Sequence, residues 1–263
     1  KIICLSMGLW SLSYRSIVFI IMNLFNFEIF TGAIDNVFLQ DERQCIVNTI
    51  NPHSLIVSLS DPEFHKALKS SDVLLPDGAG ILFASHIIND RKIDKITGPS
   101  ALDIALNHYN KKHSKVYFLG ANEKTLLLIK QRINKKYNNI KVQTYSPSFS
   151  DEFTESENRK ILNNINEFSP DLLCVGMTAP KQEKWVYINK GNLPNCCIMS
   201  IGAAFDWFSG IKKQPSEFSR KFHLAWLERF IREPIRMMPR IKSMIYFTYI
   251  IFRIKIKKPL KLL

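Results

Sequence analysis

Asp77 is the residue in this chain that is best placed to act as a general base. It follows the short apolar run Val73–Leu75 and precedes Gly78, so we expect it at the carboxyl end of a strand. A carboxylate at that position can take a proton from a substrate hydroxyl. Thr49 and Asn51 end the preceding predicted strand and should lie near Asp77 if the two strands are neighbours. The alternative is an aspartate that only forms a turn, which is the commoner role for this residue type.

A second group of polar side chains flanks two glycine turns further along the chain. Two apolar runs, 172–175 and 196–201, stop at Gly176 and Gly202, and Pro180 opens a helix between them. This order is a βαβ unit with parallel strands, and ligands bind at the carboxyl edge of such sheets. Helix N-termini at that edge offer free N–H groups that suit a phosphate. The polar residues expected there are Thr178, Lys181, Gln182, Glu183 and Asp206. The alternative is an α/β scaffold with ordinary turn glycines.

Motifs for several other kinds of chemistry are missing from the sequence. The five cysteines form no C-x-x-C pair, the six histidines are scattered, and there is no D-x-D motif, P-loop or G-x-S-x-G. The turn at 120–123 resembles a nucleotide-binding corner but lacks the full G-x-G-x-x-G. We therefore predict no metal site and no bound cofactor, and an oxidoreductase is disfavoured. Asp206, shortly after the second apolar run, could bind a ribose or sugar hydroxyl.

The elements that must position these residues alternate between strands and helices. This alternation predicts an α/β fold with a mostly parallel sheet and helices on both faces. A short strand and turn is expected over 30–37. The other expected strands are 45–50, 73–75, 115–119, 140–145, 172–175 and 196–201, and the expected helices are 61–70, 79–88, 100–109, 123–137 and 154–168.

The positive charge of the chain is concentrated at its C-terminal end. The net charge is +13 over 263 residues, and residues 212–263 hold fourteen Lys and Arg against three Glu, a net charge of +11. Such a basic segment on a nearly neutral domain implies a polyanionic partner, either an acidic lipid, a pyrophosphate or a nucleic acid.

Residues 216–233 are predicted to form one helix that ends at Pro234. Arg229, Arg232 and Arg236 are spaced by three and four residues, so we expect them on one helical face. An arginine face of this kind suits a diphosphate, because the planar guanidinium binds phosphate oxygens in pairs. The alternative is a solvated basic face.

Two apolar segments could contact a membrane. The run 244–252 lies between basic clusters, is too short to cross a bilayer, and is typical of an interfacial anchor; a terminal helix docked on the domain is the alternative. The basic residues around it are Arg240, Lys242, Arg253, Lys255, Lys257 and Lys258. The run 17–27 is either a membrane-associated leader, a poor membrane span, or sequence outside the working domain.

Five motifs that occur together and in order resemble the WecG/TagA/CpsF family of glycosyltransferases (glycosyltransferase family 26). They are L-P-D-G at 75–78, I-T-G-P-S-A at 96–101, V-G-M-T-A-P-K-Q-E-K-W at 175–185, I-G-A-A-F-D-W-F-S-G at 201–210 and W-L-E-R-F-I-R-E-P-I-R at 226–236. The resemblance covers about residues 29–240, and nothing before Phe27 matches. It implies a leader over 1–28, a Rossmann-like domain over 29–210, and a basic, membrane-associating helical appendage over 211–263.

The resemblance also implies roles for individual residues. Asp77 matches the family's proposed catalytic base, and Thr49 matches a nearby substrate-binding position. Gln182 and Asp206 match positions that contact the nucleotide sugar. Where relatives tend to carry arginine, this chain has Lys95, which keeps the charge but loses the bidentate fork. The appendage arginines that would face the diphosphate are Arg229, Arg236 and Arg240.

The function implied by the resemblance is an inverting, metal-independent sugar transfer at the cytoplasmic face of the cell membrane, in the synthesis of a cell-surface polysaccharide. The donor would be a UDP-sugar carrying a hexose or N-acetylhexosamine, with the N-acetylmannosamine type favoured. The acceptor would be a polyprenyl-diphosphate-linked sugar. A homo-oligomer is possible under this hypothesis, and no nucleic acid is expected. The alternative is a non-catalytic membrane- or nucleic-acid-binding protein that uses the basic segment.

Overall fold

A computed structural model describes residues 21–39, 43–222 and 224–257. Its centre is a six-stranded parallel sheet with the strand order β4-β3-β8-β7-β5-β6. The strands are β3 (Cys45–Ile50), β4 (Val73–Pro76), β5 (Lys115–Gly120), β6 (Lys141–Tyr145), β7 (Leu172–Gly176) and β8 (Cys197–Ser200). The six strands predicted between residues 45 and 201 are therefore present, and the α/β, Rossmann-like fold class is confirmed.

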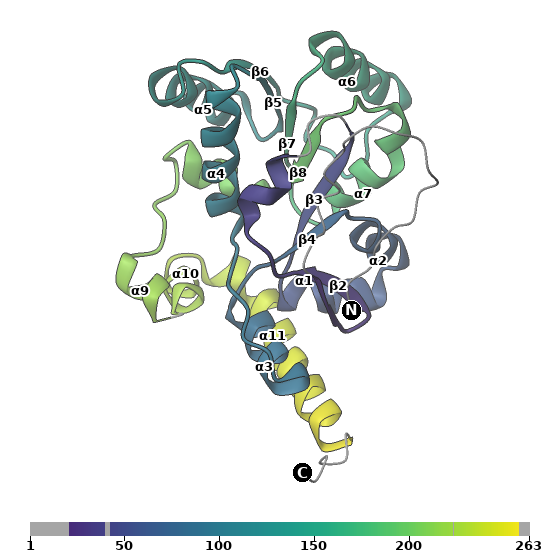
Figure 1. Ribbon diagram of the computed structural model, residues 1–263, viewed down its shortest axis with the longest axis vertical. Helices are drawn as coiled ribbons and strands as arrows, with labels where there is room; N and C mark the ends of the chain where they lie inside the picture. The colour runs from purple at the N-terminus through teal and green to yellow at the C-terminus, as the bar shows by residue number, and fades with distance from the viewer. Residues whose placement is uncertain (1–20, 40–42, 223, 258–263) are drawn as a thin grey trace, which may run out of the picture.

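Helices cover both faces of the sheet (Figure 1). One face carries α4 (Gly98–Lys111), α5 (Glu123–Lys136), α8 (Gly202–Phe208) and the 3-10 helix η1 (Ile34–Leu39). The other carries α2 (Pro62–Lys69), α6 (Glu155–Phe168) and α7 (Lys181–Asn189), which is followed by the short 3-10 helix η2 (Lys190–Asn192). The helix after β8 and the helices after β3 thus lie on opposite faces. The crevice between the ends of β3 and β8 is a topological switch point, where ligands bind in open α/β sheets.

Helix α1 (Pro52–Ser60) directly follows β3, in a stretch where the sequence analysis predicts no helix. Asn51 is its N-cap: the Asn51 side chain accepts a hydrogen bond from the Ser54 amide, and the Ser54 hydroxyl accepts one from the Asn51 amide. Pro52 fits the first helical turn because it lacks an N–H. The three residues 51–53 look like a turn, and the capping box with Ser54 is the signal for the helix.

The N-terminal described residues form a hairpin of β1 (Ile21–Leu24) and β2 (Phe27–Phe30). Met22, Leu24 and Phe27 are buried in an apolar core that also contains residues of α1, α2 and α3 (Ala79–Asn89). The short strand expected over 30–37 is wrong. Strand β2 ends at Phe30, and the 3-10 helix η1 follows it. Residues 1–20 of the predicted leader lie outside the described residues, and the boundary at residue 28 stays a prediction.

The predicted helix 216–233 consists of two shorter helices, α9 (Glu217–Lys221) and α10 (Ala225–Arg232). A third, α11 (Pro234–Lys257), runs away from the sheet beside α3 (Figure 1). Pro234 disfavours helical backbone at the preceding residue, and Glu233 accordingly has φ −138° and ψ 64°. The expectation of one arginine face is therefore wrong, because Arg236 belongs to α11 while Arg229 and Arg232 belong to α10.

Helix α11 packs against α1 and α3. Phe247 and Ile251 of α11 are buried there. Among the described helices, none has the length and apolar composition required to span a membrane.

Candidate active site at the carboxyl edge of the sheet

A cavity of about 730 Å³ opens at the carboxyl edge of the sheet, beside the ends of β3 and β4. Its walls come from the segments after β3 and β4, the segment before α4, the C-terminal part of α8, and α10 and α11. The predicted site residues that line it are Asn51, Asp77, Lys95, Arg229, Arg236 and Arg240. Residues far apart in the sequence thus meet in one cavity.

Asp77 directly follows β4 and is half-buried in the cavity wall. Strands β3 and β4 are neighbours with Thr49 opposite Leu75, and the Asp77 amide donates to the carbonyl of Ile50 at 2.8 Å. Burial raises the pKa of the Asp77 carboxyl, and the cations Lys95 and Arg229 offset part of the rise. A carboxyl with a raised pKa is a stronger base than a solvated aspartate, and nearby cations keep it ionised.

The expected proximity of Thr49, Asn51 and Asp77 is confirmed, but the first two differ in their position. Thr49 lies within β3 and is not among the residues that line the cavity. Asn51 lines the cavity, and its side-chain oxygen accepts from the Ser54 amide at 3.0 Å. That bond leaves the amide nitrogen of the Asn51 side chain available as a hydrogen-bond donor.

Lys95 lies in the segment between α3 and α4 and lines the cavity. The amide of the next residue, Ile96, donates to the carbonyl of Pro76 at 2.9 Å. This bond fixes the segment next to Asp77, which follows Pro76, and it explains why the Lys95 charge influences the Asp77 pKa.

Two arginines of the cavity are largely buried. Burial lowers the pKa of Arg229, and the Arg229 guanidinium stacks 5.0 Å from the centre of the Trp207 ring. Burial, together with the positive charges of Arg229 and Arg236, lowers the pKa of Arg240 to about 10, so Arg240 stays cationic at neutral pH. Crowded, partly desolvated guanidinium groups of this kind favour an anionic ligand.

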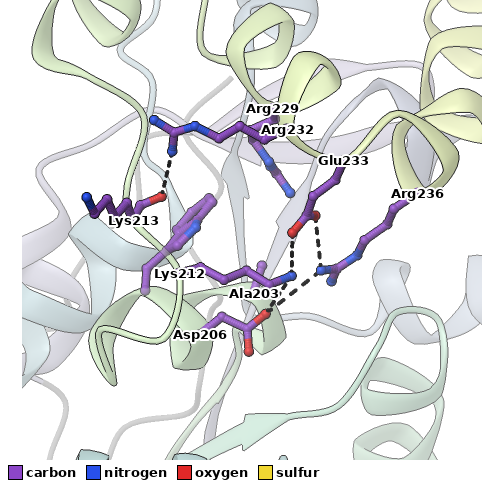
Figure 2. Close-up of a pocket in the computed structure, with 9 residues that line it drawn as sticks. Ala203, Asp206, Lys212, Lys213, Arg229, Arg232, Glu233 and Arg236 are labelled. Atoms are coloured by element: carbon purple, nitrogen blue, oxygen red, sulfur yellow. Dashed lines mark hydrogen bonds and ion pairs between the residues drawn. The ribbon is translucent and has the colours of Figure 1, made fainter.

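Asp206 lines a second, adjacent cavity of about 470 Å³ (Figure 2). Lys212 lies 3.3 Å from Asp206 and 2.7 Å from Glu233, and Arg236 lies 3.9 Å and 3.4 Å from the same two carboxylates. Arg229 and Arg236 line both cavities. This network joins α8, the segment after it, and the junction of α10 with α11.

Gln182 is not brought into either cavity. It is buried at 5% exposure, its amide nitrogen donates to Glu183 at 2.8 Å, and its oxygen accepts from the Gly202 amide at 3.0 Å. The structure therefore places Gln182 behind the site.

Sequence reasoning missed three groups that the structure brings to the site. His53 lines the first cavity, and its Nδ1 lies 2.8 Å from the Ser243 hydroxyl of α11. Lys212 and Glu233 complete the ion-pair network of the second cavity. For His53, the available signal was its place directly after the Asn51-Pro52 strand end. For Lys212 and Glu233 we find no sequence signal, because their pairing depends on how α10 folds back on α8.

The described residues contain no cluster of three or more His, Cys, Asp or Glu side chains with an arrangement that could hold a metal ion. The prediction of a metal-independent reaction stays a prediction.

A family model described as "Glycosyl transferase WecG/TagA/CpsF family" matches residues 19–261. The match begins earlier than the motifs suggest and includes the β1–β2 hairpin. It also includes α9, α10 and α11, so the C-terminal helices are part of what is similar.

Several bacterial enzymes that share the name N-acetylglucosaminyldiphosphoundecaprenol N-acetyl-beta-D-mannosaminyltransferase are similar to this chain over most of their length. The enzyme of Bacillus subtilis (strain 168) is 26% identical over 211 residues, which is 80% of each chain. The enzyme of Bacillus spizizenii (strain ATCC 23059 / NRRL B-14472 / W23) is 26% identical over 223 residues, 84% of each chain. The enzyme of Staphylococcus aureus (strain MW2) is 26% identical over 218 residues, 83% of this chain and 84% of the relative.

Proposed function

The chain belongs to the WecG/TagA/CpsF family of glycosyltransferases, and we propose that it transfers an N-acetylhexosamine from a UDP-sugar to a polyprenyl-diphosphate-linked sugar. The N-acetylmannosamine type is the favoured donor sugar, since the relatives' names specify an N-acetylmannosaminyl group. Their names likewise specify an acceptor with an N-acetylglucosaminyl group on a diphosphate and an undecaprenol.

The observation that carries this proposal is the meeting of one carboxylate and several cations in one cavity. Asp77 takes the proton of an acceptor hydroxyl, and the resulting oxygen attacks the anomeric carbon of the donor sugar. The bond from that carbon to the UDP oxygen breaks, and UDP leaves with the electron pair. A single displacement of this kind inverts the anomeric configuration. NMR of the product formed from an α-linked UDP-sugar tests this, with a β-linkage expected.

The cations of the two cavities fit the two diphosphates of such a reaction. Lys212, Arg229 and Arg236 surround the second cavity beside Asp206, where they can neutralise the charge that develops on departing UDP. A metal ion would be dispensable under this assignment, so turnover should be unchanged in excess EDTA. A fall that Mg²⁺ restores would contradict it.

Arg240 is suited to the diphosphate of the acceptor. Its guanidinium is partly buried in the wall of the first cavity, and its one hydrogen bond among the described residues runs to the Met237 sulfur at 4.0 Å. A cation held in this way lacks the strong acceptor that its burial calls for. A diphosphate supplies two such acceptors, and Arg240 lies in the same cavity as Asp77.

Helix α11 supports association with an anionic membrane, and the cytoplasmic face of the membrane remains part of the proposal. Its exposed apolar side chains recur at spacings of four, three and four residues, so they form one stripe opposite the buried Phe247. The stripe consists of Ile245, Tyr249, Phe252 and Ile256. Arg253 and Lys255 flank it, whereas the side chain of Lys257 and the whole of Lys258 lie outside the described residues. A peripheral helix of this kind would hold the cavity near a lipid-linked acceptor.

The test is release of UDP by the purified full chain, with a panel of UDP-sugars and a short-chain polyprenyl-diphosphate N-acetylglucosamine. We expect UDP release that requires both substrates, with UDP-N-acetylmannosamine giving the highest rate. No release from any UDP-sugar, together with tight binding of DNA, RNA or vesicles, would instead support the non-catalytic binding protein that the basic segment alone suggests.

A further inference from the structure

Gln182 and Glu183 form a buried hydrogen-bonded pair at the start of α7, behind the cavities rather than in them. The Gly202 amide donates to the Gln182 oxygen at 3.0 Å, so the nitrogen end of the same amide must face Glu183, to which it donates at 2.8 Å. Gln182 is 5% exposed and Glu183 is 3% exposed. Glu183 therefore fixes the orientation in which Gln182 can hold Gly202.

Gly202 packs so closely against Met177 and Gln182 that no side chain fits at this position. A Cβ atom at this position would lie 2.2 Å from the Met177 carbonyl oxygen and 2.7 Å from the Gln182 side-chain oxygen. Gly202 is the first residue of α8, and the fourth residue after it is Asp206, which reaches the second cavity. The contact thus connects α7 with the helix that presents Asp206.

The second carboxyl oxygen of Glu183 is buried and has no hydrogen-bond partner among the described residues. The Asn48 side-chain oxygen and the Ser200 hydroxyl are among the other buried atoms in the same condition. The register of β3 with β8 places Asn48 beside Ser200. Both should face the side of the sheet that carries α7, because Ile46 and Ile198, two residues earlier, pack in the core under α7.

This environment disfavours an ionised Glu183. Burial raises the pKa of its carboxyl to about 7, against the opposing effect of the Gln182 hydrogen bond. The other titratable groups in the core on this side are neutral, since burial raises the pKa of Tyr117 and of Cys196 to about 12. The adjacent Lys184 is paired with Asp61 at 2.7 Å and Glu63 at 3.3 Å on α2 and its cap. A protonated Glu183 offers a donor, and Asn48 and Ser200 offer acceptors.

We propose that Glu183, in its protonated form, is a positioning residue for the sugar transfer: it holds the Gln182 amide, which fixes Gly202 and the helix carrying Asp206. The effect on sugar transfer rests on the proposed function, whereas the effect on the position of Gly202 does not. It also assigns Gln182 an indirect role, in place of the direct contact with the nucleotide sugar that the family resemblance implies.

The test compares Glu183→Gln with Glu183→Leu in the full chain. Glutamine mimics the protonated acid, since it keeps an oxygen for Gln182 and a donor in place of the acid hydroxyl; leucine keeps the bulk and removes both. Glu167→Gln is the matched control, because Glu167 is exposed on α6. We expect Glu183→Leu to raise KM for the UDP-sugar roughly tenfold, the size of one hydrogen bond, with a smaller change for the acceptor. Glu183→Gln and Glu167→Gln should keep wild-type values at pH 6.

A readout that needs no substrate separates this inference from the proposed function. Hydrogen exchange at the Gly202 amide, corrected for its intrinsic rate, should accelerate in Glu183→Leu and not in Glu183→Gln. In the wild type it should also accelerate as the pH rises through about 7, and Glu183→Gln should abolish that change. The exchange result stands even if no UDP-sugar is turned over. Wild-type exchange in Glu183→Leu, or a wild-type exchange profile without this pH dependence, would overturn the inference.

Discussion

At the scale of single residues, the cavity depends on arginines whose shape matters as well as their charge. Arg240 is partly buried and stays cationic, with a pKa lowered to about 10. Lysine would keep the charge but present one rotating ammonium group where arginine presents a planar fork. The expected consequence is a selective loss of acceptor recognition.

We predict that Arg240→Lys lowers kcat/KM for the lipid-diphosphate acceptor about tenfold or more, and Arg240→Ala still further. KM for the UDP-sugar should change little. Lys242→Ala is the control, because Lys242 is exposed on the same helix. Equal effects of Arg240→Lys on both substrates would mean that Arg240 acts on the site as a whole.

The buried carboxyl of Glu183 should also make the stability of the fold depend on pH. Its pKa is about 7 in the folded chain against an ordinary value of 4.5. A pKa raised by folding contributes stability that is complete below pH 4.5 and is lost as the pH rises through 7. Glu183→Gln cannot ionise. The melting temperature of the variant minus that of the wild type should therefore increase by on the order of 5 °C between pH 5 and pH 8. A difference that is independent of pH would show that Glu183 is not protonated in the native state.

At the scale of elements, the break between α10 and α11 determines how the cations are arranged. Glu233 sits in that break and pairs with Lys212 and Arg236, which holds both near Asp206. These side chains are about one-third exposed or more, so each pair contributes ~1 kcal/mol or less to stability. Glu233 nevertheless neutralises cations that a phosphate would otherwise bind.

Glu233→Gln should therefore bind UDP several-fold more tightly than the wild type at low salt, with the advantage fading at high salt. Isothermal titration calorimetry at two salt concentrations measures this. Glu217→Gln on α9 is the control, because Glu217 is exposed. Weaker UDP binding by Glu233→Gln would indicate that Glu233 is needed to hold Lys212 and Arg236 in place.

Helix α11 has an inner face and an outer face with different roles. Truncation would remove Phe247 and Ile251, which are buried with α1 and α3, so the membrane role is tested by substitution on the exposed stripe. Ile245→Ser combined with Tyr249→Ser should weaken binding to anionic vesicles and leave turnover of a water-soluble acceptor unchanged. Unaltered vesicle binding would place the membrane contact elsewhere, and residues 17–27 would be examined next.

At the scale of the whole molecule, local patterns in the sequence predict the sheet and part of the site. Apolar runs that stop at glycine or proline identify the strands, and parallel strands bring their carboxyl ends to one edge, so Asn51 and Asp77 could be placed together. The break at Glu233 follows from Pro234, whereas the regular spacing of the three arginines suggested a continuous helical face. The inward position of Gln182 follows from close packing at Gly202, which spacing along the chain does not encode.

The central claim is that Asp77 deprotonates the acceptor during sugar transfer, and Asp77→Asn tests it most directly. The substitution keeps the shape of the side chain and removes its basicity. UDP release in the presence of both substrates should fall about 10²–10⁴-fold, while affinity for UDP measured by calorimetry stays at the wild-type value. A folded Asp77→Asn protein that turns over at the wild-type rate would contradict the account.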